Sequence, residues 1–248
     1  MTWSIVACDE DTGHLGVAVA SRFFAVGALV PHIRPGIGAV ATQAFINPMY
    51  GPAALDRLAQ LGPEATLGAL TAADAGHRNR QLHLVDAGGR AAAFTGPDCV
   101  NWAGHLTAPG VSVAGNMLAG PEVVAETLRV YQEGRALPFA ERLMAAMEAG
   151  EAAGGDKRGR QSAALVIHKG QDYPWLSIRA DDHADPLAEL RRLYAVAQER
   201  FLHVMEVVPT RENPSGATDR SHIDARIAAL EAQRIAEGRP SPSFATPL

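Results

Sequence analysis

The chain has 248 residues, of which 47% are hydrophobic and 20% charged, and its formal net charge is -5. No apolar run approaches the roughly 20 residues that a membrane span needs, and no cluster of Lys and Arg offers a surface for nucleic acid. The start of the chain lacks the pattern of a signal peptide, and two cysteines are too few for a disulfide framework. We therefore expect a globular, cytoplasmic protein whose partner is a small molecule or a peptide, with no nucleic acid and no membrane.

The first half of the chain predicts a hairpin, a third strand and then a pair of helices. The strands are expected where strand-forming residues lie between turn residues, at 3–8, 15–20 and 36–44. The helices are expected at 53–60 and 63–73. Pro63 stands at a favourable first helical position, and the third strand ends in the polar pair Thr42 and Gln43. The chain therefore starts directly in a sheet.

The second half repeats this order. Strands are expected at 81–86, 90–94, 111–114, 161–168 and 175–179. Helices are expected at 121–133, 138–149 and 187–205. Hairpins, rather than strand-helix-strand crossovers, favour antiparallel sheets with helices packed outside. The expected fold class is α+β, a four-layer αββα sandwich with two mainly antiparallel sheets between helical layers.

The chain changes in character near its end. We expect a main domain over 1–208 and a peripheral tail over 209–248, made of a linker, a short helix at 223–236 and a Pro-rich end. The helix at 187–205 carries apolar residues at helical spacing, namely Leu187, Leu190, Leu193, Tyr194, Ala197 and Phe201. This face predicts a homodimer. The alternative is that it covers a sheet of its own subunit.

Thr2 is the first candidate for chemistry. Removal of Met1 would leave a free α-amine beside the hydroxyl of Thr2, and an α-amine has an unperturbed pKa of about 7.7–8.0. The amine could therefore accept the hydroxyl proton at neutral pH, which makes the pair a nucleophile with its own base. Many chains begin Met-Thr for reasons of translation, so the dipeptide alone does not establish this role.

Other reactive residues give weaker signals. Cys8 is a rival nucleophile, but a free Cys in an apolar strand is more often part of a core. The nine histidines show no metal-ligand spacing, and those at positions 14, 32, 77, 83, 105 and 168 are scattered singly. Because zinc sites usually show paired ligands in the sequence, we expect no metal and no cofactor. The glycines at 36 and 38 lack the Lys and the following helix of a phosphate-binding loop.

Several segments resemble the family catalogued as domain of unknown function 1028. These segments are residues 1–7, 16–21, 41–44, 47–48, 50–52, 115–116 and 154–163, and the resemblance extends from residue 1 to about residue 170. That family is grouped with the N-terminal-nucleophile (Ntn) hydrolases, so the resemblance implies an αββα sandwich and an amide-cleaving ancestry. The substrate of the family has not been generally assigned.

The resemblance also implies catalytic residues. Thr2 matches the N-terminal nucleophile, and Asp156 and Ser162 fall where the proteasome-like branch places an Asp and a Ser near the N-terminal amine. The Lys that assists the nucleophile in that branch has no match here, because this part of the chain offers only His32 and Arg34. Other members of the superfamily depend chiefly on the α-amine of the nucleophile itself.

Further residues are candidates for binding the substrate or the oxyanion. Amide and hydroxyl side chains next to Gly or Pro suggest the lip of a pocket, and basic side chains could bind a carboxylate or a phosphate. This group contains Thr42, Gln43, Asn47, Asn116, Arg22, Arg158 and Arg160. Backbone N–H groups near Thr42 and Asn116 are the expected oxyanion donors.

Two hypotheses of different classes follow. The first is an amidohydrolase that cleaves an amide bond of a small molecule or a short peptide, with Thr2 as nucleophile. The second is a non-catalytic member that keeps the fold as a small-molecule-binding or assembly scaffold. Whether Met1 is removed separates them.

Overall fold

The computed structural model describes residues 2–245. The chain forms two compact units, residues up to Leu187 and residues from Ala188 onward. This division lies inside a helix, earlier than the boundary at 208/209 expected from the sequence, and the two-domain division at that boundary stays a prediction. Within the described residues, no helix has both the length and the apolar character needed to cross a bilayer.

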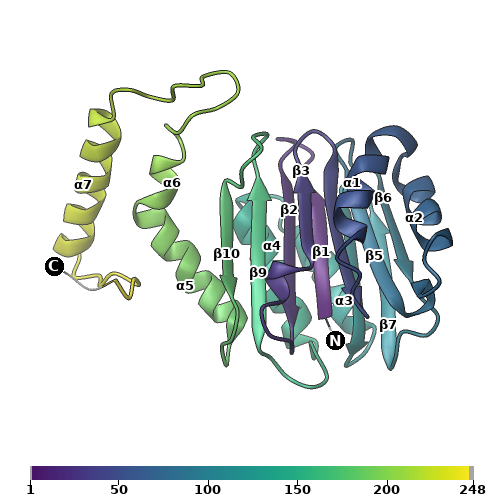
Figure 1. Ribbon diagram of the computed structural model, residues 1–248. Coiled ribbons are helices and arrows are strands. Elements are labelled where there is room, and N and C mark those ends of the chain that lie inside the picture. Colours follow the sequence, from purple (N-terminus) through teal and green to yellow (C-terminus); the bar gives the residue numbers. More distant parts are fainter. Residues whose placement is uncertain (1, 246–248) are drawn as a thin grey trace. The chain divides into compact units, whose positions relative to one another are not determined.

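Six antiparallel strands form the first sheet, in the order β10-β9-β2-β1-β8-β7 (Figure 1). They are β1 (Thr2–Cys8), β2 (Leu15–Ser21), β7 (Trp102–Ala108), β8 (Val111–Leu118), β9 (Ser162–His168) and β10 (Leu176–Ala180). β1 is a central strand, with Trp3 opposite Ala20 of β2 and Thr2 opposite Asn116 of β8. Thr2 therefore begins a strand that has neighbours on both sides.

Four antiparallel strands form the second sheet, in the order β3-β4-β5-β6. They are β3 (Pro31–Arg34), β4 (Gly38–Ala44), β5 (Arg80–Asp86) and β6 (Ala91–Thr95). The face of this sheet that carries Ala39 and Ala41 packs against Val6 and Val17 of the first sheet. The two sheets therefore lie face to face.

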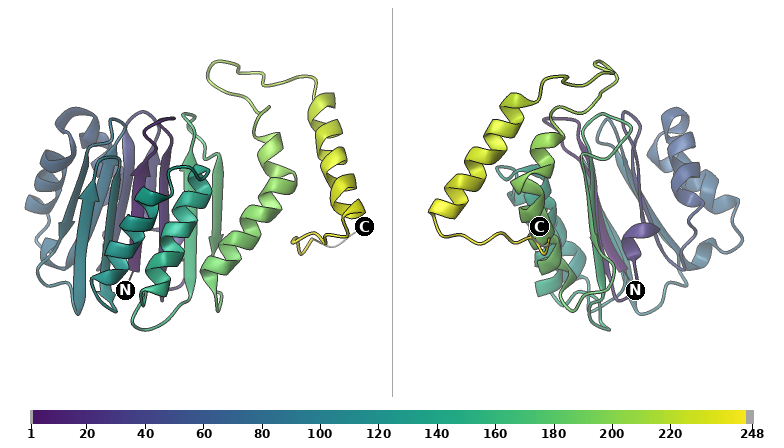
Figure 2. Two further views of the ribbon diagram at one scale, coloured as in Figure 1. Left: turned by 180° about the vertical axis from the view of Figure 1, so that it is seen from behind. Right: turned by 60° about the vertical axis from the view of Figure 1, so that its left-hand side comes forward.

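Helices cover the outer face of each sheet (Figure 2). α1 (Tyr50–Leu61) and α2 (Pro63–Ala72) lie on the second sheet, and α3 (Glu122–Glu133) and α4 (Phe139–Ala152) lie on the first. Gly16 allows α4 to approach β2 closely, because a Cβ at this position would be 2.7 Å from Leu143 Cδ1. The architecture is the predicted α+β sandwich of four layers, αββα, which confirms the expected fold class.

Some element boundaries differ from those predicted. β3 and β7 were not predicted as strands, and β8 extends to Leu118 although the sequence suggested an end at Ala114. Two short 3-10 helices, η1 (Val26–Ala28) and η2 (His77–Asn79), lie in the connections. The longer β8 matters for the site, because it places Asn116 inside the sheet.

The space between the sheets has an apolar part and a polar part. Eleven buried residues, among them Val6, Cys8, Leu15 and Val85, form an apolar cluster. Toward the beginning of β1 the same space contains buried polar side chains, which include Ser4, Gln43, Gln81, His83, Ser112 and Asn116. Because buried polar groups need hydrogen-bond partners, this part of the interior is described in detail with the site.

The second unit is helical. α5 (Pro186–Glu199) begins at the end of the first unit, and α6 (Phe201–Val204) and α7 (Ser221–Ala236) follow. The single helix predicted at 187–205 is interrupted at Arg200, whose backbone angles, φ -148° and ψ -49°, are not helical. The tail helix expected at 223–236 is present and begins two residues earlier.

Candidate active site

Thr2 places its side chain between the two sheets. Side chains alternate along a strand, so Thr2 shares a face with Ser4 and Val6, and Val6 belongs to the core between the sheets. Thr2 is only 7% exposed, and its Oγ1 lies 3.0 Å from Oγ of Ser21. Ser21 is the last residue of β2, directly beside Thr2 in the sheet. Two hydroxyl groups therefore lie together where β1 begins.

Two amide side chains approach the backbone of Thr2, and a third joins them. Nδ2 of Asn116 donates to the Thr2 carbonyl oxygen at 3.3 Å, and Nε2 of Gln43 lies 3.5 Å from the same oxygen. Both nitrogens also donate to Oε1 of Gln81, at 3.1 Å from Asn116 and 2.7 Å from Gln43. Because β8 and the second sheet provide these amides, they fix Thr2 relative to both sheets.

A buried histidine continues the polar network. Ser4 donates its hydroxyl hydrogen to Oε1 of Gln43 at 2.6 Å, so Nε2 of His83, 2.7 Å away, must donate to Ser4. Nδ1 of His83 faces the hydroxyl of Ser112 at 3.0 Å and accepts from it. Complete burial, with a smaller contribution from His105, lowers the pKa of His83 to about 3. His83 is therefore neutral in the folded protein at ordinary pH.

Asp156 closes the sheet ahead of Thr2. Its backbone forms an antiparallel bridge with Leu118 of β8. Thr2 is opposite Asn116 in the pairing of β1 with β8, so Leu118 is opposite the position two residues before Thr2. Its carboxylate accepts the backbone N–H of Arg22, just past β2, at 2.7 Å. Asp156 is thus joined to β8 and to the residue that follows β2, the two neighbours of β1, and its carboxylate is buried.

The basic residues predicted for substrate binding divide into two sets. Arg22 and Arg158 belong to the Asp156 cluster: Arg158 donates its backbone N–H to Asp156 at 2.8 Å, and Arg22 donates to the Arg158 carbonyl at 2.5 Å. Both side chains extend to the exterior. Arg160 instead forms ion pairs with Glu151 and Asp185, so the structure does not bring it into this cluster.

Ser162 holds the loop that follows β2. It lies opposite Ser21 in the pairing of β2 with β9. Its hydroxyl donates to the carbonyl of Phe23 and accepts the N–H of Val26 at 3.2 Å. The structure therefore places Ser162 one strand away from Thr2 as a support for the loop, and the catalytic role suggested by the resemblance stays a prediction.

Thr42 and Asn47 lie away from Thr2. The side chain of Thr42 points to the helical side of its sheet and donates to the Asn47 carbonyl at 3.1 Å, while its N–H donates to Val30 at 3.3 Å. Asn47 Nδ2 donates to Asp74 at 3.4 Å. The structure thus gives the Thr42 N–H a partner other than an oxyanion. Gln43 and Asn116 are also not at a pocket lip as expected, because both are buried.

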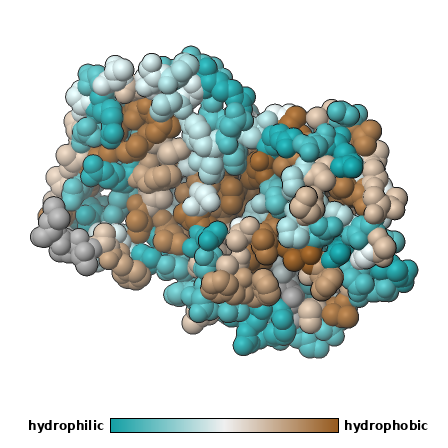
Figure 3. Space-filling view, viewed as in Figure 1, coloured by the Kyte–Doolittle hydropathy of each residue, from teal (hydrophilic) through white to brown (hydrophobic). Residues whose placement is uncertain are grey.

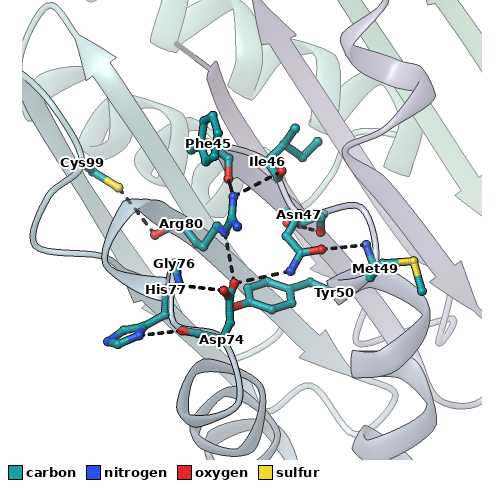
Figure 4. A network of polar contacts seen from close by, with 11 residues as sticks. Phe45, Ile46, Asn47, Met49, Tyr50, Asp74, Gly76, His77, Arg80 and Cys99 are labelled. Carbon is teal, nitrogen blue, oxygen red and sulfur yellow. Dashed lines mark hydrogen bonds and ion pairs between the residues drawn. The ribbon is translucent and has the colours of Figure 1, made fainter.

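Asp74 is the centre of a cluster beside β4 (Figure 4). Its carboxylate accepts from the Tyr50 hydroxyl at 2.8 Å, the Gly76 N–H at 2.8 Å and the Arg80 Nε at 3.1 Å. These donors, with Tyr50 contributing most, lower the pKa of Asp74 to about 2. Arg80 in turn donates to the carbonyls of Phe45 and Ile46. The cluster fixes the loop between β4 and α1.

The remaining reactive candidates do not join the Thr2 site. Cys8 lies at the other end of β1 with its thiol 3.7 Å from the Ala87 carbonyl, and burial raises its pKa. His32 is 3.1 Å from the Leu29 carbonyl and Arg34 pairs with Asp56, so neither replaces the missing Lys. Among the described residues, no group of three or more His, Cys, Asp or Glu is arranged to hold a metal ion.

Sequence reasoning missed part of the network. Four residues of this network were not proposed as site residues from the sequence, namely Ser4, Gln81, His83 and Ser112. Ser4 and Gln81 bond to Gln43, and His83 bonds to Ser4 and Ser112. A usable signal was present at Gln81 and His83: polar residues at alternate positions of an otherwise apolar strand share one face. They indicate a polar interior rather than a solvent-facing side.

The fold and the site together define an αββα protein with a buried hydroxyl at the start of a central strand and a buried aspartate bridged to the neighbouring strand β8. The chain belongs to the family described as "Family of unknown function (DUF1028)", whose family model matches residues 2–190. A search of curated proteins finds no match.

Two solved structures provide comparisons. The crystal structure of protein SPO2555 from Silicibacter pomeroyi, assigned to DUF1028, is 32% identical, with 89% of this chain and 97% of that chain covered and a TM-score of 0.82. Anbu (ancestral beta-subunit) from Yersinia bercovieri is 12% identical over 78% of this chain and 93% of that chain, with a TM-score of 0.34. A score that low carries no argument about this chain.

Proposed function

We propose that this protein is an N-terminal-nucleophile amidohydrolase in which Thr2 attacks the amide carbonyl of a small molecule or short peptide. The observation that carries the proposal is the arrangement at the start of β1. The Thr2 hydroxyl lies beside Ser21, and Asp156 lies two residue positions ahead in the sheet. An Asp next to an α-ammonium group stabilises its charge, so this position suits an N-terminal nucleophile.

The chemistry requires that Thr2 become the first residue. Met1, whose removal we predict, lies outside the described residues. Once free, the Thr2 α-amine accepts the hydroxyl proton as Oγ1 bonds to the amide carbon. The same proton passes to the nitrogen of the leaving amine as the C–N bond breaks. Water then attacks the resulting ester and releases the acid, which restores the Thr2 hydroxyl.

The surrounding groups position the nucleophile in this scheme. Asn116 holds the Thr2 carbonyl, Gln43 supports it through Gln81 and the Ala114 carbonyl, and Ser21 contacts the hydroxyl. Both hydrogens on Asn116 Nδ2 already have acceptors, Thr2 and Gln81, so this amide orients Thr2 and does not act as an oxyanion donor. Precise placement of a nucleophile is itself a large part of catalysis.

The test begins with the intact mass and the N-terminal residue of protein from its native host. The proposal predicts a chain that starts at Thr2. A chain that retains a residue before Thr2 would refute the α-amine mechanism and favour the non-catalytic scaffold. The processed protein is then incubated with a β-lactone, and peptide mass mapping should locate an acyl adduct on Thr2.

Variants separate chemistry from folding. Thr2→Ala should abolish the adduct and turnover with a loss of stability of about 1–2 kcal/mol, because the lost hydroxyl is buried and bonds to Ser21. Asp156→Asn should slow the reaction by up to about a hundredfold and shift the pH profile on the limb set by the amine. Thr107→Ala, on the exposed edge strand β7, is the matched control and should label like the wild type. An adduct on Cys8 would also contradict the assignment.

A further inference from the structure

Exposed apolar residues gather on two loops at the Thr2 end of the sandwich. Phe23 and Phe24, which follow β2, are 53% and 62% exposed. Phe45 and Met49, which follow β4, are 72% and 70% exposed. These include every exposed phenylalanine among the described residues of the first unit. Large apolar side chains grouped in the open usually mark a binding surface, and Figure 3 shows hydrophobic surface on this part of the first unit.

The two loops come from different sheets, and each follows a strand residue that lies close to Thr2. Phe23 is two residues beyond Ser21, whose hydroxyl contacts Thr2, and Phe45 is two residues beyond Gln43, whose amide contacts the Thr2 carbonyl. Two residues span at most about 7 Å of chain. Because the Thr2 side chain points between the sheets, a molecule at its hydroxyl would have one loop on each side.

The loop after β4 is held in its exposed position. Arg80 donates to the carbonyls of Phe45 and Ile46, and its guanidinium lies 5.0 Å from the centre of the Phe45 ring. Asp74 fixes Arg80, as Figure 4 shows. Ile46 packs against the core between the sheets, so it anchors the loop from inside while Phe45 faces out. The open position of Phe45 is therefore imposed by the fold.

The loop after β2 is held in a comparable way. Ser162 bonds to Phe23 and Val26, and the N–H of Ala25 donates to Asp181 at 3.0 Å. Each loop also contains a non-glycine residue with left-handed backbone, Ala25 at φ 52° and Ala44 at φ 69°. Such conformations persist only where the surroundings impose them, and they are frequent at ligand-binding sites.

We infer that the two loops bind a large apolar acyl group of the substrate, with Phe23 and Phe24 on one side and Phe45 and Met49 on the other. The acyl part is the choice of occupant because it stays bonded to Thr2 after the amine has left, so a fixed wall beside Thr2 contacts it in both steps. This inference rests on the proposed function. Asp74 and Ser162 are positioning residues that act through the loops.

The test uses binding that requires no reaction. Thr2→Ala protein is titrated with 4-phenylbutanamide and with acetamide and followed by NMR. We expect the phenyl compound to bind at least tenfold more tightly, with the largest shifts at Phe23 and Phe45. Phe23→Ser and Phe45→Ser, which alter exposed side chains, should each reduce this preference several-fold, and Asp74→Asn should reduce it by displacing the Phe45 loop. Leu137→Ser, an exposed residue on the α3–α4 connection, should leave it unchanged. Equal affinities for the two amides would overturn the inference. So would a preference for the phenyl compound that survives in a variant carrying both Phe23→Ser and Phe45→Ser.

A second arm separates this inference from the proposed function. Protein with Thr2 intact is treated with β-lactones that carry a phenylethyl or a methyl group. Faster labelling of Thr2 by the phenylethyl compound supports both proposals, and equal rates of labelling refute the apolar acyl site while the nucleophile stands. If Thr2 is not labelled but the phenyl amide still binds preferentially, the nucleophile is wrong and the apolar binding site stands.

Discussion

Replacing His83 with Gln should weaken the dependence of stability on acid pH. His83 has no exposed surface and bonds to Ser4 and Ser112 as the neutral imidazole. Its pKa is about 3 in the folded protein, against about 6.5 in an unfolded chain. Because the folded pKa is the lower one, the unfolded chain takes up the proton first. Stability due to this group is therefore complete above about pH 6.5 and is lost progressively as the pH falls toward 3.

The size of the effect follows from these two pKa values. At pH 5 the unfolded chain is 1.5 pH units below the normal histidine pKa, which corresponds to a loss of about 2 kcal/mol in the free energy of unfolding. Gln cannot be protonated, but it can still donate and accept one hydrogen bond on each side. The variant should therefore lack this loss, whatever its stability at neutral pH.

Urea unfolding between pH 7.5 and pH 5 measures the difference. All three tryptophans, Trp3, Trp102 and Trp175, belong to the first unit, so their fluorescence follows the unfolding of that unit alone. Burial also lowers the pKa of His14, His32, His105 and His168, and their contribution is common to both proteins. His222→Gln, in the exposed face of α7, is the control. If His83→Gln loses as much stability as the wild type between these pH values, the reasoning about a neutral buried histidine is wrong.

Three further predictions concern other parts of the chain. Asp74→Asn should lower the free energy of unfolding by about 1–2 kcal/mol at pH 7, because the Tyr50 and Arg80 donors lose a charged acceptor. The wild type should lose the same stability as the pH falls from 3.8 toward 2. A variant that is as stable as the wild type at pH 7 would contradict this. Iodoacetamide should leave Cys8 unmodified in the native protein and modify it after unfolding, since burial raises its pKa; rapid native modification, read by mass mapping, would be the opposite result. In analytical ultracentrifugation the full-length protein should sediment as a dimer. If the full-length protein and a variant truncated at Thr210 both sediment as monomers, this prediction is wrong.

The order of the elements was predictable because turn residues and hydrophobic patterns separate them clearly. The hairpin of β1 and β2 and the helix pairs α1–α2 and α3–α4 follow from such signals. β7 and β3 were missed for physical reasons. β7 is an edge strand with three consecutive exposed residues at 105–107, and β3 is four residues long and begins with Pro31, so neither shows the alternation of a buried strand.

The candidate site was only partly predictable. The expectation that Thr2 and Asp156 belong to one site came from the resemblance. Asn116 was expected at a lip, because a polar residue after Gly115 suggests the end of a strand. The strand instead continues, and Gln81 supplies the hydrogen bond that makes a buried Asn tolerable. Such a partner is distant in sequence, so a single strand's pattern cannot reveal it.

The two halves of the space between the sheets differ in how firmly they fix relative position. Contacts among Val6, Val85 and their neighbours are non-directional, so their energy is less sensitive than that of a hydrogen bond to small changes in angle and position. Hydrogen bonds from Gln43 and Gln81 to the first sheet lose strength within a few tenths of an ångström and with modest changes in angle. Translation between the sheets is therefore set at the end that carries Thr2. Substitutions in the apolar half should change how strongly the sheets adhere, whereas substitutions among the amides should change where the Thr2 hydroxyl lies.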